Sequence, residues 1–309
     1  MFKPLHCGLY FTYDHVGQAR RERDSEPFRS AFQYLREREQ QGPQAAQWYG
    51  LRYRLDADEY AGELAIAALE RYISEPLTED ITYLDAVAQT MMLGQAFEMT
   101  RDHAAWQREG QFEWLNAFQE RVNALSTSPY KDTQVENLWM AALVLVSGVL
   151  LEREDIFRVG VDVFRRTVDQ DISPRGHIPK AVDGEDGGSL YRQMLSISAL
   201  VLMAEAATHC GVDLWAYNNR GVSVTTAAVY PIYYFYTPEQ WKWDAGITQD
   251  ESQHLFRRCG GFLEIVNRRT EFKDLKPLLE DLRPIYDPHG GGLTTLTHGI
   301  PVKKRGLFG

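Results

Sequence analysis

The 309-residue chain has few cysteines, no very long apolar run and a deficit of positive charge. Cys7, Cys210 and Cys259 lie far apart and outside any zinc-site spacing, so we expect them to pack as small apolar side chains and predict no metal site. The longest apolar run, residues 138–151, is shorter than the roughly 20 residues of a membrane span. The net charge of −10 argues against a nucleic-acid partner, because such surfaces need a basic face.

The beginning of the chain, MFKPLHCGLYFTYDH, lacks the continuous apolar segment of a signal peptide. We therefore expect a cytoplasmic chain, or a secreted or periplasmic one if a leader has been trimmed. An anionic ligand would have to meet a local cluster of basic side chains, and such clusters occur around Arg20, Arg52, Arg54, Arg257, Arg258 and Arg268. Each of them is otherwise a solvated helix face, which is the usual role of a charge run.

Apolar residues recur at helical spacing along most of the chain, and strand signals are almost absent. Two stretches, ENLWMAALVLVSGVLL and SLYRQMLSISALVLMAEAA, are apolar nearly all round, which predicts inner helices over 134–151 and 189–209 covered by amphipathic outer ones. No Pro/Ser-rich linker divides the chain. The pattern predicts an all-α fold, one α/α toroid of helical hairpins over residues 1–309, with a C-terminal extension from about residue 237.

The stretch HIPKAVDGEDGGSLYR, residues 177–192, crowds histidine, acids, glycines and a Tyr-Arg pair in front of the second inner helix. One interpretation is a turn, in which Gly187 and Gly188 give the backbone freedom and Ser189 caps the helix. The other is an active site, because the loops at one rim of a toroid converge on a central cleft.

Several stretches resemble one known family. HCGLYFTYDHVGQARRERDSEPFRSAFQYL is similar to the opening of alginate lyase-like and heparinase-type polysaccharide lyases, and WYGLRYRLDADEYAGELAIAALERYI to their second hairpin. MAEAATHCGVDLWAY is similar to a recurring stretch that follows the inner helix, with GVDLW as the most specific piece. The resemblance covers most of residues 5–235. It implies an α/α toroid and β-elimination on a uronic-acid polymer such as alginate, polymannuronate or glucuronan.

Such a lyase binds the uronate carboxylate, removes the proton at C5 and protonates the departing glycosidic oxygen. The family's Asn-His pair falls on QVENLW, where Asn137 fits and Glu136 occupies the histidine position. Its Arg/Leu/Tyr run falls on GEDGGSLYR, where Tyr191 is one residue early and Arg192 holds the tyrosine register. One residue is about 100° of rotation on a helix. The resemblance implies Tyr191 as proton relay, Asn137 on the carboxylate, and His177 or Arg192 assisting.

The expected partner is an anionic polysaccharide or oligosaccharide, with no nucleic acid, membrane or cofactor, and the oligomeric state stays open. Candidate contacts for the polymer are charged side chains and aromatic rings that could stack on sugars: Glu136, Trp139, Trp48, Tyr130, Arg52 and Lys180. An aromatic residue at helical spacing is more often part of the core.

Two alternatives remain open at this stage. Paired carboxylates could hydrolyse a glycosidic bond instead, and the acids available for that are Asp183, Glu185, Asp186 and Glu136. The acid-rich DGEDGG lacks the ligand spacing of a calcium loop. The toroid could also bind glycans without cleaving them, since the family's histidine is missing at position 136.

Overall fold

The computed structural model describes residues 2–76, 80–128, 133–184, 187–244, 246–270 and 272–302. Over these ranges the regular elements are helices, apart from one short antiparallel hairpin of β1 (Asn218–Asn219) and β2 (Val222–Ser223). Its helices are α1 (Tyr13–Arg21), α2 (Phe28–Glu37), α3 (Gln44–Asp56), α4 (Glu59–Ser74), α5 (Tyr83–Thr100), α6 (Arg108–Ser126), α7 (Gln134–Leu150), α8 (Glu154–Gln170), α9 (Pro179–Val182), α10 (Ser189–Thr208), α11 (Val224–Val229), α12 (Tyr233–Tyr236), α13 (Gln249–Cys259), α14 (Gly261–Thr270), α15 (Leu275–Leu282) and α16 (Thr294–His298).

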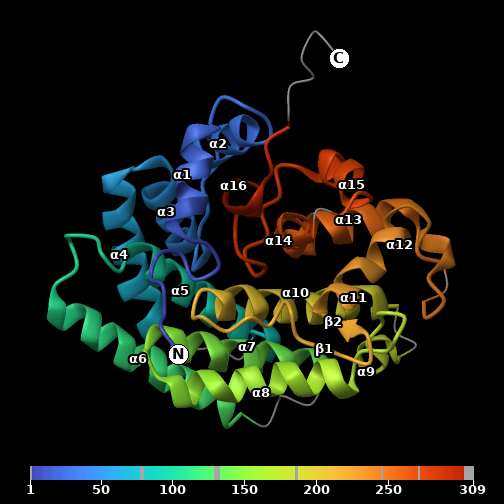
Figure 1. Cartoon of the computed structure of the whole chain (residues 1–309). Helices are drawn as coiled ribbons and strands as arrows, with labels where there is room; N and C mark the ends of the chain where they lie inside the picture. Colours follow the sequence, from blue (N-terminus) through green and yellow to red (C-terminus); the bar gives the residue numbers. More distant parts are fainter. Residues whose placement is uncertain are drawn as a thin grey trace.

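Contacts between helices close into a ring. Helix α3 packs on α5, α5 on α7, α7 on α10, α10 on α14 and α14 on α16. Helix α16 contacts α1 and α2, and both of these return to α3. Helices α4, α6 and α8 pair with α3, α5 and α7 as the outer members of hairpins. Helix α8 runs along the lower side of the ring in Figure 1, outside α7 and α10. The predicted α/α toroid is confirmed.

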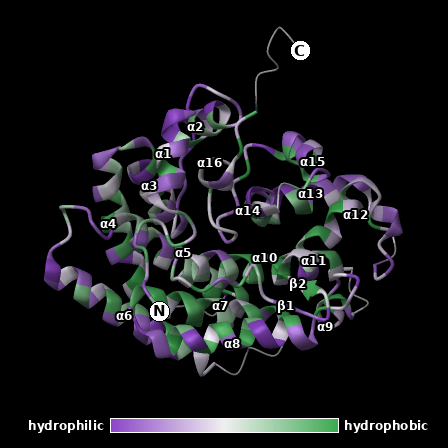
Figure 2. Ribbon diagram, viewed as in Figure 1, coloured by the Kyte–Doolittle hydropathy of each residue, from purple (hydrophilic) through white to green (hydrophobic). Residues whose placement is uncertain are grey.

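The inner helices are the apolar ones. Nearly all of α7 and α10 is buried, and both are mostly green in the hydropathy colouring of Figure 2, whereas α8 carries a polar outer face. A helix that is apolar all round has to be covered on all sides. The predicted inner helices over 134–151 and 189–209 therefore correspond to α7 and α10. None of the described helices combines the length and the apolar character that a membrane span requires.

Glycines let α7 and α8 approach closely. A Cβ atom at Gly148 would lie 2.3 Å from the backbone nitrogen of Phe157, and one at Gly160 would lie 2.5 Å from the Cβ of Leu145. These positions leave no room for a side chain, because interiors are packed to the density of crystals. The two glycines thus set the spacing of the hairpin that carries the N-terminal end of α7.

Candidate functional site

The N-terminal end of α10 is held by an aspartate from far along the chain. Asp244 Oδ2 accepts hydrogen bonds from the Ser189 backbone nitrogen (2.8 Å), the Ser189 hydroxyl (2.5 Å) and, more weakly, the Leu190 nitrogen (3.4 Å). The Trp241 indole donates to the same hydroxyl at 2.7 Å. The predicted Ser189 cap is therefore wrong. Ser189 is the first helical residue, and the carboxylate of Asp244 satisfies the free N–H groups.

This fixed start places Tyr191 on the third residue of α10, beside Arg258 of α13. The guanidinium carbon of Arg258 lies 5.2 Å from the centre of the Tyr191 ring, and its Nη2 lies 3.5 Å from the hydroxyl oxygen. Tyr191 is half-buried, and Arg258 is exposed. Burial raises the pKa of the Tyr191 phenol above its ordinary value, as do the nearby Cys259, Asp85 and Asp287, and the positive charge of Arg258 opposes that rise. The arrangement pairs a proton-carrying oxygen with a cation.

Arg192 faces a different part of the molecule. Its Nε donates to the carbonyl oxygen of Ala181 at 2.8 Å, and its Nη2 lies 3.4 Å from the carbonyl oxygen of Asp183. A guanidinium in this position ties the C-terminal end of α9 to α10. The side chains of Tyr191 and Arg192 therefore contact different neighbours, because consecutive residues of a helix point about 100° apart.

The chain between α15 and α16 descends into the centre of the ring (Figure 1). Asp287 on this segment is buried and accepts the backbone N–H groups of Gly290 (2.8 Å) and Gly261 (3.2 Å), while burial raises its pKa. Gln95 donates to the Gly291 carbonyl at 2.9 Å, and Gln47 of α3 donates to Gln95 at 2.7 Å. The segment therefore links α3, α5 and α14 across the interior, close to α10.

The candidate residues on α7 do not line a common groove with Tyr191. Glu136 closes a capping box with Thr133, whose backbone nitrogen donates to it at 3.2 Å. Asn137 is exposed and lines a groove of about 430 Å³ among α7, α8 and α9, together with Lys180 but without Tyr191. Lys180 pairs with Asp171 at 3.1 Å. The polar start of α7 therefore serves the helix end and an outer groove.

The candidate tryptophans are core residues. Trp48 is fully buried and donates to the Arg38 carbonyl at 3.0 Å, and Trp139 is 1% exposed and donates to the Leu195 carbonyl at 3.1 Å. Neither indole offers a free face to a sugar in this structure. The Trp139 ring does lie 6.4 Å from the imidazole of His289, at the central segment.

The other candidates have neighbours other than Tyr191 and Arg258. His177 bonds Ser173 at 2.8 Å and lies 4.8 Å from the Trp243 ring, and burial together with nearby cations lowers its pKa. Arg52 pairs with Asp58 at 2.7 Å, near the C-terminal end of α3. Tyr130 lies outside the described residues, as do Glu185 and Asp186 of the hydrolase alternative.

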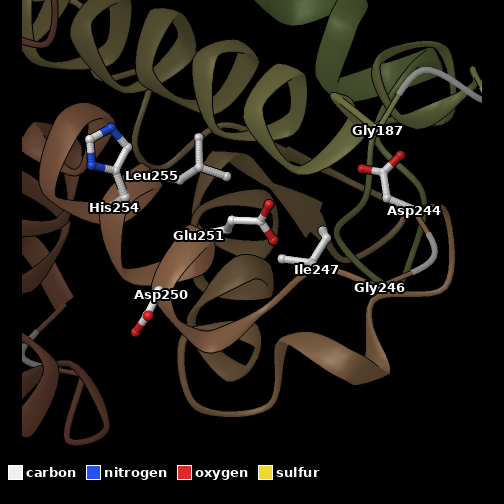
Figure 3. Close-up of a pocket in the computed structure, with 8 residues that line it drawn as sticks. All are labelled: Gly187, Asp244, Gly246, Ile247, Asp250, Glu251, His254 and Leu255. Atoms are coloured by element: carbon white, nitrogen blue, oxygen red, sulfur yellow. The ribbon is translucent and has the colours of Figure 1, made fainter.

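A pocket of about 630 Å³ adjoins the start of α10 (Figure 3), lined by Gly187, Asp244, Gly246, Ile247, Asp250, Glu251, His254 and Leu255. The Glu251 carboxylate points into it toward Ile247, whereas Asp250 points away. Oδ1 of Asp244 is buried and has no hydrogen-bond partner in the part of the chain that the structure describes. His254 lies one helical turn before Arg258 on α13, and neither Tyr191 nor Arg258 lines this pocket.

One group in the described ranges has its possible ligand atoms close enough for a metal ion: His15, Glu205 and His298. The hydrogen bonds do not fit a metal. His298 Nε2 faces the Tyr10 carbonyl at 3.1 Å and must carry its proton, while Nδ1 of His15 accepts from the Thr12 backbone nitrogen. Both carboxylate oxygens of Glu205 already accept from the Arg269 guanidinium, at 2.7 and 2.8 Å. The group is therefore a buried cluster in which Glu205 is ion-paired with Arg269.

Comparison with known proteins identifies the class. The sequence model described as alginate lyase matches residues 14–241, and the chain belongs to the alginate lyase family. It is thus a polysaccharide lyase of the kind that acts on polyuronates. The matched segment contains Tyr191 and Arg192 and ends before Asp244 and Arg258.

Solved structures share the fold. A variant of alginate lyase A1-III with one tyrosine replaced by phenylalanine, complexed with tetrasaccharide, has a TM-score of 0.71 at 18% identity, over 84% of this chain and 76% of that one. Alginate lyase A1-III from Sphingomonas species A1 gives 0.70 at 17%, over 84% and 75%. An alginate lyase from Bacteroides ovatus gives 0.70 at 12%, over 95% and 99%. No curated protein matches the chain.

Two features of the site escaped sequence reasoning. Asp244 stands in WKWDAGITQDE, where nothing marks it as the cap of a helix that begins 55 residues earlier. The Arg257-Arg258 pair was visible as a basic cluster, but its packing beside Tyr191 depends on the contact of α13 with α10.

Proposed function

We propose that this protein cleaves a uronic-acid-containing polymer, of the alginate, polymannuronate or glucuronan type, by β-elimination with Tyr191 as the proton relay. The observation that carries the proposal is the position of Tyr191, half-buried at the N-terminal end of an inner helix with a guanidinium beside its hydroxyl. Membership of the alginate lyase family supplies the class of reaction.

The proposed reaction is balanced and consumes no water. The Tyr191 phenolate takes the proton from C5, the electron pair left on C5 forms the C4=C5 double bond, and the bond from C4 to the glycosidic oxygen breaks. The tyrosine hydroxyl then returns its proton to the departing oxygen. One polymer becomes two fragments, one of them with an unsaturated end, and the phenolate is regenerated. A tyrosine serves both steps because its oxygen can accept and donate a proton.

Two observations on relatives support a polymer ligand. An alginate lyase A1-III variant with a tyrosine replaced by phenylalanine was crystallised with a tetrasaccharide, and so was a variant with a histidine replaced by alanine. A ligand of that size suits a chain with grooves at the ends of several helices. The proposed partner of this protein is accordingly an anionic polysaccharide or oligosaccharide.

A panel of polymers tests the proposal. The protein is incubated with polymannuronate, polyguluronate, glucuronan and hyaluronan while ultraviolet absorbance reports the conjugated alkene. We expect a rising signal on at least one uronate polymer and none on its carboxyl-reduced form. If no polymer produces the chromophore although oligosaccharides accumulate, the lyase proposal is wrong.

A further inference from the structure

A lyase of this kind needs a cation at the uronate carboxylate. Neutralising the negative charge of that carboxylate makes the proton at C5 more acidic. The arginine predicted from the sequence, Arg192, points to the carbonyl oxygens of Ala181 and Asp183. The other expected contacts, Lys180 and Arg52, form ion pairs with Asp171 and Asp58. The cation beside Tyr191 therefore has to come from another element.

Helix α13 supplies one. The exposed Arg258 guanidinium lies over the Tyr191 ring, with 5.2 Å from its carbon to the ring centre, and Nη2 is 3.5 Å from the hydroxyl oxygen. Among the described residues, no carboxylate lies within ion-pair distance of Arg258. A guanidinium presents five N–H donors in a planar fork, so one edge can stay near the tyrosine while the rest meets a carboxylate.

The helix backbone at Arg258 is anchored by its neighbours. The next residue, Cys259, is buried, and Phe256 is also buried, so this end of α13 is anchored against the core while position 258 stays at the surface. Helix α13 packs directly on α10, the helix of Tyr191. A stacked aromatic ring restricts the guanidinium plane and reduces the entropy lost when it binds an anion.

We infer that Arg258 is the carboxylate-binding residue of the active site, with its guanidinium holding the uronate carboxylate next to the Tyr191 hydroxyl. This inference rests on the proposed function. It assigns substrate binding to a helix that lies beyond residues 14–241, the segment matched to the family. It also explains how the chain places a cation beside its tyrosine while Arg192 is engaged elsewhere.

The test compares three variants on the polymer that the wild type cleaves best. Arg258→Met removes the charge, Arg258→Lys keeps a charge without the fork, and Arg257→Met is the matched control, since Arg257 is the adjacent exposed arginine of α13. We expect Arg258→Met to lower kcat/KM by about 10- to 100-fold, the range for a hydrogen bond to a charged group. Arg258→Lys should recover part of the loss, and Arg257→Met should stay within about twofold.

A pH profile separates this role from a structural one. Without the positive charge of Arg258, the pKa of Tyr191 rises further, so the activity of Arg258→Met should reach its maximum at a higher pH than that of the wild type. Equal melting temperatures of the three variants serve as the folding control. A profile unchanged by Arg258→Met, or an equal loss in Arg257→Met, would overturn the assignment.

Binding distinguishes failure of this inference from failure of the proposed function. Titration calorimetry compares a uronate tetrasaccharide with its carboxyl-reduced form. The wild type should prefer the uronate, and Arg258→Met should lose that preference, whether or not the wild type cleaves the polymer. A wild type that cleaves polyuronates while Arg258→Met keeps the full preference refutes only the role of Arg258. A wild type that prefers the uronate but produces no alkene refutes only the lyase reaction.

Discussion

Replacing Asp244 with alanine should destabilise the start of α10 measurably. Asp244 is 5% exposed and accepts three donors, the Ser189 nitrogen, the Ser189 hydroxyl and the Leu190 nitrogen. Losing a helix cap costs about 0.5–2 kcal/mol, and leaving buried donors without an acceptor costs about 1–3 kcal/mol. The expected loss of unfolding free energy is therefore about 2–4 kcal/mol. Tyr191 lies in this first turn, so turnover should fall as well.

Thermal unfolding gives the readout. With an unfolding entropy of about 2.1 cal/mol/K per residue, a chain of 309 residues loses about 1.5 °C of Tm per kcal/mol, so we expect a decrease of about 3–6 °C. The control is Asp250→Ala, which removes an exposed carboxylate from the first turn of α13 and should cost about 1 kcal/mol at most. A Tm of Asp244→Ala within about 1 °C of the wild type would refute the capping role.

Three further predictions concern other parts of the molecule. Tyr191→Phe should fold and bind substrate like the wild type but lower kcat by about 100-fold or more, measured by alkene formation; undiminished turnover would exclude the tyrosine relay. Gly148→Ala should lower the unfolding free energy by about 1–3 kcal/mol in urea titrations, because its Cβ would lie 2.3 Å from the Phe157 nitrogen. The control is Gly110→Ala, whose Cβ would have its nearest neighbour 3.9 Å away and which should be neutral or stabilising. Burial lowers the pKa of His298, so below about pH 6.5 the unfolded chain binds a proton that the folded chain does not. The unfolding free energy should therefore decrease from about pH 7 to about pH 5, by up to about 1.4 kcal/mol per pH unit for this residue, and an increase in denaturant titrations would contradict the assignment.

The fold was predictable because its signal is local. Apolar residues on every side of two helices mark them as inner helices, and the predicted ranges differ from α7 and α10 by one residue at each C-terminal end. The closing of the ring through α14 and α16 carried no comparable signal. It depends on a segment around Asp287 and its glycines that contacts α3, α5 and α14 far away in sequence.

The candidate site was predictable only in part, because its neighbours come from parts of the chain that are far apart in sequence. The resemblance to the lyase family made Tyr191 a candidate, but Arg258, which lies beside it in the structure, is 67 residues further along the chain. Trp48 and Trp139 were candidates because aromatic rings stack on sugars, and the structure buries both. Asn137 is at the right end of α7, but on the side that faces the groove with Lys180. Which side of a helix meets the cleft is decided by tertiary packing.

The fate of oxygen during cleavage distinguishes β-elimination from hydrolysis directly. The polymer that gives the strongest alkene signal is digested in water enriched in heavy oxygen, and the new ends are analysed by mass spectrometry. β-Elimination adds no water, so we expect one unsaturated end for each new reducing end and no heavy oxygen incorporated at the moment of cleavage. Saturated fragments carrying one heavy oxygen per cleaved bond would contradict it and favour hydrolysis by paired carboxylates.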